Sequence, residues 1–410
     1  MPDIQIAGAV YPDVPAIDVP VSGGGTARYV YPVDVQPSDV NFFDYDGALL
    51  YSYTAAQFAA LTAMPANPTH DGLVSQGWNW TLADAKTQTA SYGACDIGQM
   101  YTTSDGKTRF YLSIYDALRG EVTLRFYQAN AGSLTIDWGD GTQETPSGSG
   151  NITVTHTYSA AGDYVASVSV ASGKSIYIGF SSNTAGFGVM LRKVEVGSGV
   201  YTISRYGLAG APALESVTLP NTLSSLGTDA LRYDTMLKHI TVPSSVTALS
   251  SNVFLGNSTM KSVSLPKSYT SCGGNVLYAL ASAHRLVFPQ TTVLSIPNSM
   301  FYACSVLEQL IFPSNITSIG SSSFANCTAL TQITIPSGVT SIATKAFSGC
   351  TRLAAIHFKP SSPPTVGAAD AFASLPTDCI IYVPSGKLSA YTGAQNYPSS
   401  ATYTYREEST

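Results

Sequence analysis

The sequence has few charged residues. Asp, Glu, Lys and Arg make up 11% of its 410 residues, against roughly 25% in an average globular protein. The net charge is -6, so the chain lacks the basic surface that neutralises phosphates, and we exclude nucleic acid as a partner. Ser, Thr, Tyr, Asn and Gln must therefore cover much of the surface.

Long apolar segments are also missing. No run of about 18 apolar residues occurs, which predicts no membrane span. The opening MPDIQIAGAVYPDVP has neither a basic start nor an apolar core, so we expect no signal peptide, and the chain ends TYREEST without a sorting tail. A hydrophobic content of 44% and 35 glycines still indicate a folded, turn-rich protein.

Motifs that carry catalysis are absent. The sequence contains no His-Glu-x-x-His, no Gly-x-Ser-x-Gly elbow and no P-loop. Its five histidines are dispersed, and no two carboxylates stand out as an acid and a base. We therefore predict that the protein is not an enzyme and that it needs no cofactor.

The six cysteines contain no C-x-x-C pair, which makes a zinc site improbable on chemical grounds. Cys304, Cys327 and Cys350 recur every 23 residues. We interpret them as small buried thiols. Their spacing alone leaves a disulfide between stacked coils open.

A repeat fills the second half of the chain. It is marked by prolines at intervals of 23, 23, 23, 24 and 23 residues, namely Pro220, Pro243, Pro266, Pro289, Pro313 and Pro336. Apolar columns keep the same register, for example Leu208, Leu231, Phe254, Leu277, Phe301, Phe324 and Phe347. A fixed period of this length indicates a solenoid whose coils share one core.

The pattern LTxITIPxxVTSIxxxAFxGCxx resembles the BspA-type leucine-rich repeat, over about residues 188–383. The resemblance implies a parallel β-solenoid of about eight coils. The segment 354–399 resembles the closing part of such arrays and would cover the open sheet edge.

Two stretches upstream resemble other modules of surface proteins. LTIDWGDGT (134–142) followed by VTHTYSAAGDYVASVSV (154–170) is similar to the PKD-type immunoglobulin-like domain. Asp137 and Asp140 in this turn offer oxygens to a Ca²⁺ ion. The interpretation we prefer is that they accept hydrogen bonds from turn amides.

The stretch 42–80, from FFDYDG to GWNW, resembles the Listeria–Bacteroides repeat, which implies a small β-grasp-like domain. Trp78 and Trp80 alternate along a strand, so we expect one ring inside and one outside. An exposed Trp80 would be a stacking platform for a sugar, and a buried structural role is the favoured alternative.

The first 38 residues contain short β-rich pieces separated by prolines and by the run SGGG. We expect a separate arm that docks onto something else. It resembles openings of tailed-phage virion proteins.

These observations predict a mainly β, multidomain chain. The segments are 1–38, an arm; 39–118, β-grasp-like; 119–186, a PKD-like β-sandwich; 187–383, the solenoid; and 384–410, a C-terminal cap.

In the solenoid repeat L-x-x-V-x-L, the residues between the inward ones point outward. They predict a wide polar sheet face that binds a partner, with an ordinary solvated face as the alternative. The expected binding column is Lys193, Ser216, His239, Ser262, Arg285, Gln309 and Gln332.

Three extracellular-type modules without an enzyme signature indicate adhesion or display. Our first hypothesis is a bacteriophage virion protein, a fibre or decoration component. Its arm would bind other virion proteins, and its solenoid would contact host-surface or mucin glycans or proteins, as a homo-oligomer on the virion surface. The alternative is a bacterial cell-surface adhesin of BspA type, and a glycan-active enzyme ranks third.

Overall fold

The computed structural model describes residues 39–116, 120–179, 189–267, 269–289, 295–311 and 313–408. Upstream of these it describes only the backbone of four strands, which pair as two antiparallel hairpins: β1 (Ile4–Ile6) with β2 (Ala9–Tyr11), and β3 (Ala16–Val21) with β4 (Gly25–Val30). The arm expected over residues 1–38 lies mostly outside the described residues, and its docking role stays a prediction.

The first compact unit is a small domain with a four-stranded sheet of order β6-β5-β8-β7. The central strands β5 and β8 are parallel, and the outer pairs are antiparallel. Its elements are β5 (Val40–Phe43), β6 (Leu49–Tyr53), α1 (Ala55–Ala60), β7 (Leu73–Trp78), α2 (Leu82–Tyr92) and β8 (Cys95–Thr103). The small β domain expected here is present, and its assignment to the β-grasp class stays a prediction.

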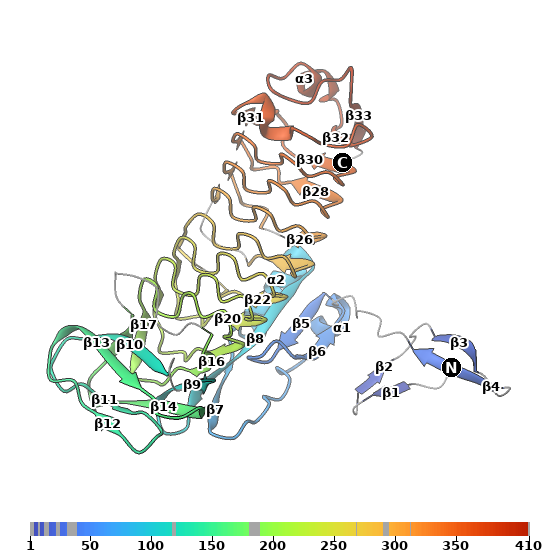
Figure 1. Ribbon diagram of the computed structural model, residues 1–410. Coiled ribbons are helices and arrows are strands. Elements are labelled where there is room, and N and C mark those ends of the chain that lie inside the picture. The colour runs from blue at the N-terminus through green and yellow to red at the C-terminus, as the bar shows by residue number, and fades with distance from the viewer. Residues whose placement is uncertain are drawn as a thin grey trace.

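Both helices of the small domain begin at capping residues that the sequence supplies. Thr54 and Gln57 form a capping box at the start of α1. Thr81 accepts a hydrogen bond from the Asp84 amide at the start of α2, and Gly93, with φ 76°, ends that helix. These two caps fix the ends of the helix α2, which runs beside the solenoid (Figure 1).

The next unit consists of two antiparallel sheets on a shared apolar core. One has the order β12-β11-β14-β9 and the other β13-β10-β15. The strands are β9 (Thr108–Ile114), β10 (Glu121–Gln128), β11 (Leu134–Asp137), β12 (Gln143–Glu144), β13 (Gly150–Thr157), β14 (Gly162–Val170) and β15 (Ile176–Ile178). We call this unit the two-sheet region; its membership of the PKD family stays a prediction.

The strand β9 lies before the expected segment boundary at residue 118, but it belongs to the two-sheet region. It pairs with β14 of the two-sheet region and, on its other side, with β16, the first strand of the solenoid. The hydrophobic cluster that starts at Phe110 runs without interruption to Tyr391. The two-sheet region and the solenoid therefore form one body rather than two modules in series.

Each coil of the solenoid contributes one strand to each of two stacks, and the parallel pairing within each stack is divided into several short sheets. The first stack contains β16 (Leu191–Glu195), β18 (Ser216–Thr218), β20 (His239–Thr241), β22 (Ser262–Ser264), β24 (Arg285–Val287), β26 (Gln309–Ile311), β28 (Gln332–Ile335), β30 (Ala355–Phe358), β32 (Ile380–Pro384) and β33 (Thr404–Glu408). The second contains β17 (Val200–Ile203), β19 (Ser225–Leu226), β21 (Ala248–Leu249), β23 (Ser271–Cys272), β25 (Ser295–Ile296), β27 (Ser318–Ile319), β29 (Ser341–Ile342) and β31 (Thr365–Val366). Registers such as His239 opposite Ser262 confirm the 23-residue period.

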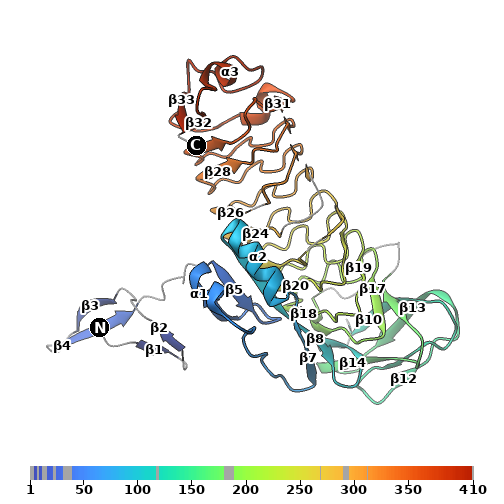
Figure 2. The same cartoon turned by 180° about the vertical axis from the view of Figure 1, so that it is seen from behind.

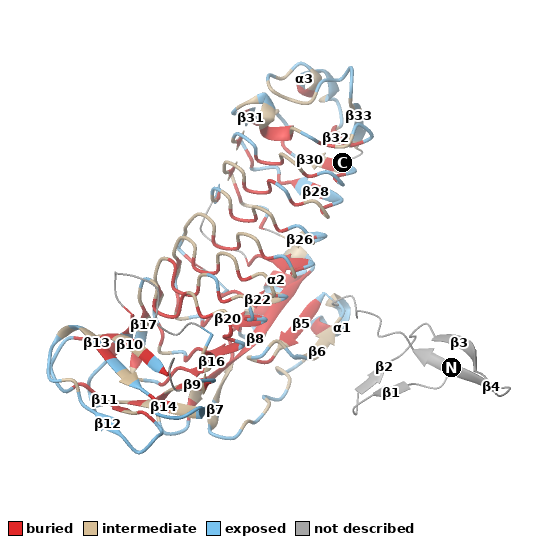
Figure 3. Ribbon diagram, viewed as in Figure 1, coloured by how far each residue is buried: buried red, intermediate tan, exposed pale blue. Residues whose placement is uncertain are grey.

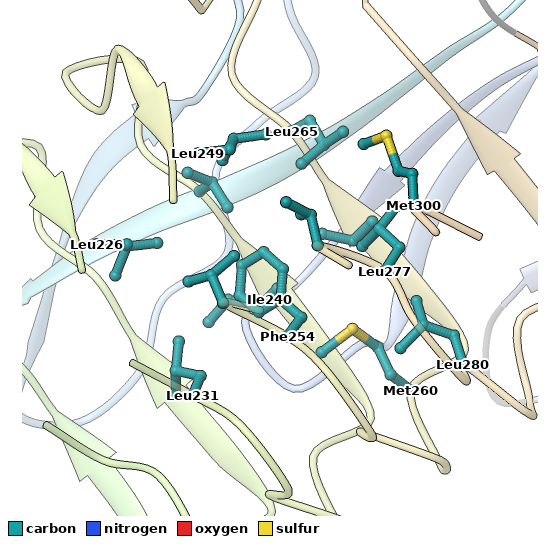
Figure 4. Close-up of a cluster of buried hydrophobic side chains, with 14 of the residues drawn as sticks. Leu226, Leu231, Ile240, Leu249, Phe254, Met260, Leu265, Leu277, Leu280 and Met300 are labelled. Carbon is teal, nitrogen blue, oxygen red and sulfur yellow. The ribbon is translucent and has the colours of Figure 1, made fainter. Parts of the chain in front are cut away.

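Between these sheets lies a core in which equivalent residues of successive coils stack. Figure 4 shows the middle of this core, where Leu231, Phe254 and Leu277 follow one another. Further along, the rings of Phe301, Phe324 and Phe347 lie parallel, with centroids 5.2 Å apart at each step. The apolar columns expected from the sequence are confirmed.

The cysteine column belongs to this core. All six cysteines are free thiols, and Cys304, Cys327 and Cys350 are buried. The thiol of Cys350 donates a hydrogen bond of 3.1 Å to the carbonyl of Phe324 in the preceding coil, and Cys304 and Cys327 make the same bond to their neighbours. Burial raises the pKa of Cys304 and Cys350 to about 12, so both thiols stay protonated at pH 7.

The far end of the solenoid is closed by the last residues of the chain. The strand β33 adds to β32 in parallel, after the helix α3 (Leu388–Thr392), and a 3-10 turn spans Ala369–Phe372. Tyr391 is buried, and its hydroxyl donates to the Pro360 carbonyl at 2.7 Å. The terminal strand carries Arg406, Glu407 and Glu408, charges that hinder pairing with another chain at this edge.

The assembled molecule is elongated, with the two-sheet region at one end and the closing segment at the other (Figures 1 and 2). The small domain lies against the side of the solenoid. Within the part of the chain that the structure describes, no helix has the length and apolarity needed to cross a membrane.

Candidate binding surface

The small domain covers the first half of the face that the sequence analysis expected to be open. Its strand β8 crosses β18, β20 and β22, and α2 continues in the same direction toward β24 and β26 (Figure 2). Figure 3 shows β8, β20 and β22 mostly in the colour of buried residues. Among the described residues, the small domain leaves the face open from β26 onward.

Gly98 allows the close approach of β8 to the solenoid. A Cβ atom at this position would lie 2.0 Å from Thr241 Oγ1 and 2.8 Å from Ser264 Cβ. Side chains of every other residue type would therefore hold the two surfaces apart. The short Thr and Ser side chains of the solenoid face are what this contact requires.

Asn79 and Trp80 fix the small domain to backbone carbonyls of the solenoid. The Asn79 side-chain amide lies 3.2 Å from the carbonyl oxygens of Val242, Ser264 and Leu265, which belong to two neighbouring coils. The Trp80 indole donates to Leu265 O at 3.1 Å. Trp80 is 7% exposed, so the sugar-platform hypothesis is wrong and the buried alternative is confirmed.

A buried ion pair joins the two surfaces further along. Arg285 donates to Asp96 Oδ1 at 2.8 Å and to the Asp39 carbonyl at 3.1 Å, and Asn41 donates to the same Asp96 oxygen. Burial raises the pKa of Asp96, and the Arg285 guanidinium opposes that shift. Arg285 is 9% exposed and is engaged inside the molecule. The expectation that it lies in the middle of an open binding face is corrected.

His239 is enclosed by the same contact. Its ring stacks on Phe43 with centroids 5.2 Å apart, and its two nitrogens lie 2.7 Å from Ser262 Oγ and 3.1 Å from Thr241 Oγ1. Burial lowers its pKa from 6.5 to about 3, so the ring is neutral at pH 7.

Taken together, the expected binding column divides into a covered part and an open part. Ser216 and His239 are buried, Ser262 is half-buried against His239, and Lys193 binds Glu195 at 2.8 Å. Gln309 and Gln332 are exposed. The sequence could not show this division, because the covering domain precedes these coils by more than a hundred residues.

The open part of the face forms a groove of about 650 Å³. We call it the open-face groove. Its floor consists of β26, β28 and β30, and its lining includes Gln309, Gln332, Thr334, His357 and Lys359. The two amides stand one coil apart, and Leu310 and Ile311 add a half-buried apolar strip. A surface of this kind suits an extended ligand that accepts and donates hydrogen bonds at regular intervals.

Both ends of the open-face groove are defined by side chains from outside these three strands. Tyr92, at the end of α2, lines one end. At the other end Glu408 of β33 hydrogen-bonds to His357 and Lys359. Burial acts to raise the pKa of Glu408, but the hydrogen bonds from Lys359 and His357 outweigh it and hold that pKa below its ordinary value. The His357 ring is further held parallel to Tyr382, with centroids 4.6 Å apart.

The carboxylates of the two-sheet region have a structural role. Asp137 accepts from the Gly139 amide, and Asp140 accepts from the Thr142 amide, each at 3.0 Å. The second oxygen of Asp140 lies 2.7 Å from His156 Nε2. The preferred interpretation, bonding to turn amides, is confirmed. Among the described residues no group of three or more His, Cys, Asp or Glu side chains could hold a metal ion.

The repeats were then compared with known proteins. Residues 187–292 and 277–380 match the model of the BspA type leucine rich repeat region, in six copies. This part of the chain is therefore a BspA-type leucine-rich-repeat solenoid, as the repeat pattern indicated. No curated protein matches the chain at a significant level.

Several solved structures are similar to part of the chain. A leucine-rich repeat protein from Bacteroides ovatus ATCC 8483 is 20% identical, with 52% of this chain and 77% of that chain covered and a TM-score of 0.26. A leucine rich repeat protein of T. pallidum is 21% identical, with 43% of this chain and 72% of that chain covered and a TM-score of 0.34. The pneumococcal vaccine antigen PcpA is 15% identical, with 57% of this chain and 85% of that chain covered and a TM-score of 0.32. Such values carry no argument about function.

Proposed function

We propose that the protein is a non-enzymatic surface adhesin of the bacterial cell-surface type, and that the open-face groove is where it contacts its partner. The partner class is a glycan or an extended protein segment on a host surface or in mucin. The observation that carries the proposal is the groove itself, a regular polar face that remains uncovered on an otherwise covered sheet.

The BspA-type match of residues 187–380 supports the cell-surface assignment over the bacteriophage one. The bacteriophage hypothesis depended on the residues at the two ends of the chain, and no described contact favours it. The PKD-like and β-grasp-like assignments belong to the same proposal, since both module types are common in surface proteins. The bound Glu408 at the groove's end and the tightly packed coils support binding by a rigid, preorganised surface.

Contacts made by exposed amides and hydroxyls are individually weak, so we expect strong adhesion only when many copies act together. The test uses the full chain displayed in many copies on beads, applied to a glycan array, to mucin and to whole cells. The groove variant carries Gln309→Ala and Gln332→Ala together. We expect the signal retained by this variant to be at least about tenfold lower than that of the parent chain. A loss of this size corresponds to two or more lost hydrogen bonds.

The matched control is Gln143→Ala, which removes an exposed amide from β12, far from the groove. It should bind like the parent chain. Retention of no cell, mucin or glycan by the parent chain would contradict the adhesin proposal. Equal binding by the groove variant and the parent would show that adhesion uses another surface.

A further inference from the structure

We propose that a second pocket, at the junction between the two-sheet region and the first solenoid coil, binds an acidic saccharide. The proposal is independent of the open-face groove, which lies on later coils of the solenoid. This junction pocket has a volume of about 510 Å³, within the range of small-molecule sites.

Three turns from different parts of the chain build the junction pocket. They are the turn between β8 and β9, around Gly106; the end of β14 with the turn that follows it, from Ser169 to Ser175; and the turn between β16 and β17, with Ser198 and Gly199. Turns that converge on a rigid frame are the usual place for binding residues.

Close contacts fix these turns against one another. A Cβ atom on Gly197 would lie 2.1 Å from the Gly106 carbonyl oxygen, and one on Gly199 would lie 2.7 Å from Val170 Cβ. The Gly197 amide donates to Thr108 Oγ1 at 3.0 Å, and the Ile176 amide donates to the Gly199 carbonyl at 3.1 Å. The pocket is therefore formed before a ligand arrives, which lowers the entropic cost of binding.

The charges of the pocket favour an anion. Its charged lining consists of Lys107, Lys174 and Asp105. Asp105 accepts a hydrogen bond of 2.8 Å from Arg109 and forms a longer ion pair of 4.0 Å with Lys107. Two ammonium groups therefore accompany one carboxylate that Arg109 also neutralises, so the lining has a positive charge on a protein whose net charge is -6.

The rest of the lining suits a sugar ring. Tyr201, at the start of the solenoid, is 44% exposed and offers an apolar surface beside the two lysines. The other polar groups are short hydroxyls: Ser169, Ser172, Ser175 and Ser198. An aromatic ring supports the apolar side of a saccharide while hydroxyls and ammonium groups bind its polar groups. A free inorganic anion would use the lysines and leave Tyr201 without a role.

The test measures binding of small probes to the full chain by saturation-transfer NMR and calorimetry. The acidic probes are glucuronate and N-acetylneuraminate, the neutral probes are glucose and galactose, and the free anions are sulfate and phosphate. We expect the acidic sugars to bind at least about tenfold more tightly than the neutral sugars or the free anions. Their binding should weaken at about 1 M salt, where the screening length is about 3 Å.

Two variants place the binding in the junction pocket. Tyr201→Ala and Lys174→Gln should each weaken acidic-sugar binding by about tenfold. Their matched controls, Tyr177→Ala and Lys261→Gln, alter an exposed tyrosine on the neighbouring strand and an exposed lysine on another coil. Both controls should bind as the parent chain does.

Four results would overturn the inference. Neutral sugars that bind as well as acidic ones would remove the role of the lysines. Full competition by equimolar sulfate or phosphate would show a free-anion site. Binding that is unchanged in Tyr201→Ala, or absent from the parent chain, would remove the site itself. The Gln309/Gln332 variant should bind the acidic probes normally, so failure of this proposal and failure of the adhesin proposal are distinguishable.

Discussion

At the scale of single residues, Gly98 decides whether the small domain can dock on the solenoid. We predict that Gly98→Val undocks it, because the added Cβ would overlap Thr241 Oγ1 at 2.0 Å. Overpacking of this kind costs about 1–3 kcal/mol or more. Undocking exposes the Trp80 side chain. Its fluorescence should then shift to longer wavelength, and iodide should quench it.

A control glycine is available in the strand β14. A Cβ on Gly162 would meet Tyr164 at 3.5 Å, an ordinary contact distance. Gly162→Ala should leave Trp80 protected from iodide. If Gly98→Val also left Trp80 protected, the close approach of β8 would not be what holds the domain.

Residue-scale features divide into those that the sequence reveals and those that it hides. The Phe324 and Cys327 columns are visible, because a repeated core position demands the same size and polarity in each coil. Gly98 is not visible as a docking residue, because the atoms that require a glycine belong to Thr241 and Ser264, far along the chain. The pairing of Arg285 with Asp96 is hidden for the same reason, because the two residues are far apart in the sequence.

At the scale of elements, each coil depends mainly on its neighbours. We predict that Phe347→Ala removes about 3–5 kcal/mol of local stability, because it leaves a cavity between Phe324 and Phe372, whose rings lie 5.2 and 5.7 Å from it. Hydrogen exchange should accelerate in β27, β29 and β31 and remain slow in β10 and β14. Faster exchange in β10 and β14 instead would contradict the nearest-neighbour picture.

The docked pair of β8 and β20 should respond to acid. Burial lowers the pKa of His239 from 6.5 to about 3, so the docked state favours the neutral ring. The docking free energy is therefore fully present above about pH 6.5 and decreases as pH falls toward 3, by up to about 1.4 kcal/mol per pH unit. We expect Trp80 fluorescence to report undocking in this range.

The variant His239→Gln should lose this pH response, whereas His284→Gln, which alters a side chain that is 63% exposed, should keep it. Asp96 acts in the opposite direction, because burial raises its pKa. The difference between parent and His239→Gln isolates the histidine. An identical pH response in the two chains would exclude His239 as its cause.

Elements were predicted well where the period was regular and poorly where separate parts of the chain meet. The alternation in LTQITI is sufficient to predict β28, since burial alternates along it. The strand β9 has an equally clear alternation, but nothing local shows that its partners are β14 and β16. The open-face groove was half predicted: Gln309 and Gln332 are part of it, while its boundary at Tyr92 comes from α2.

For the whole molecule, the continuity of the sheets means that the solenoid depends on the two-sheet region for its first edge. We predict that a chain beginning at residue 187 aggregates, because β16 and β17 lose β9 and β15 as partners and expose unpaired edges. A chain beginning at residue 39 should remain monodisperse by size-exclusion chromatography in the same buffer. A monodisperse, folded chain from residue 187 would show that the first coil is stable without that cover.

The position of the small domain also has a mechanical consequence for an adhesin. The strands of the coils run across the long axis, so tension between the two ends pulls along the ladder hydrogen bonds and opens coils one at a time. Asn79 ties together two of these coils, and Gln88 holds the carbonyl of Phe288 further along. The coils under the small domain therefore resist extension as a unit. No described hydrogen bond from the small domain joins the coils of the open-face groove, so those coils would lengthen first under load.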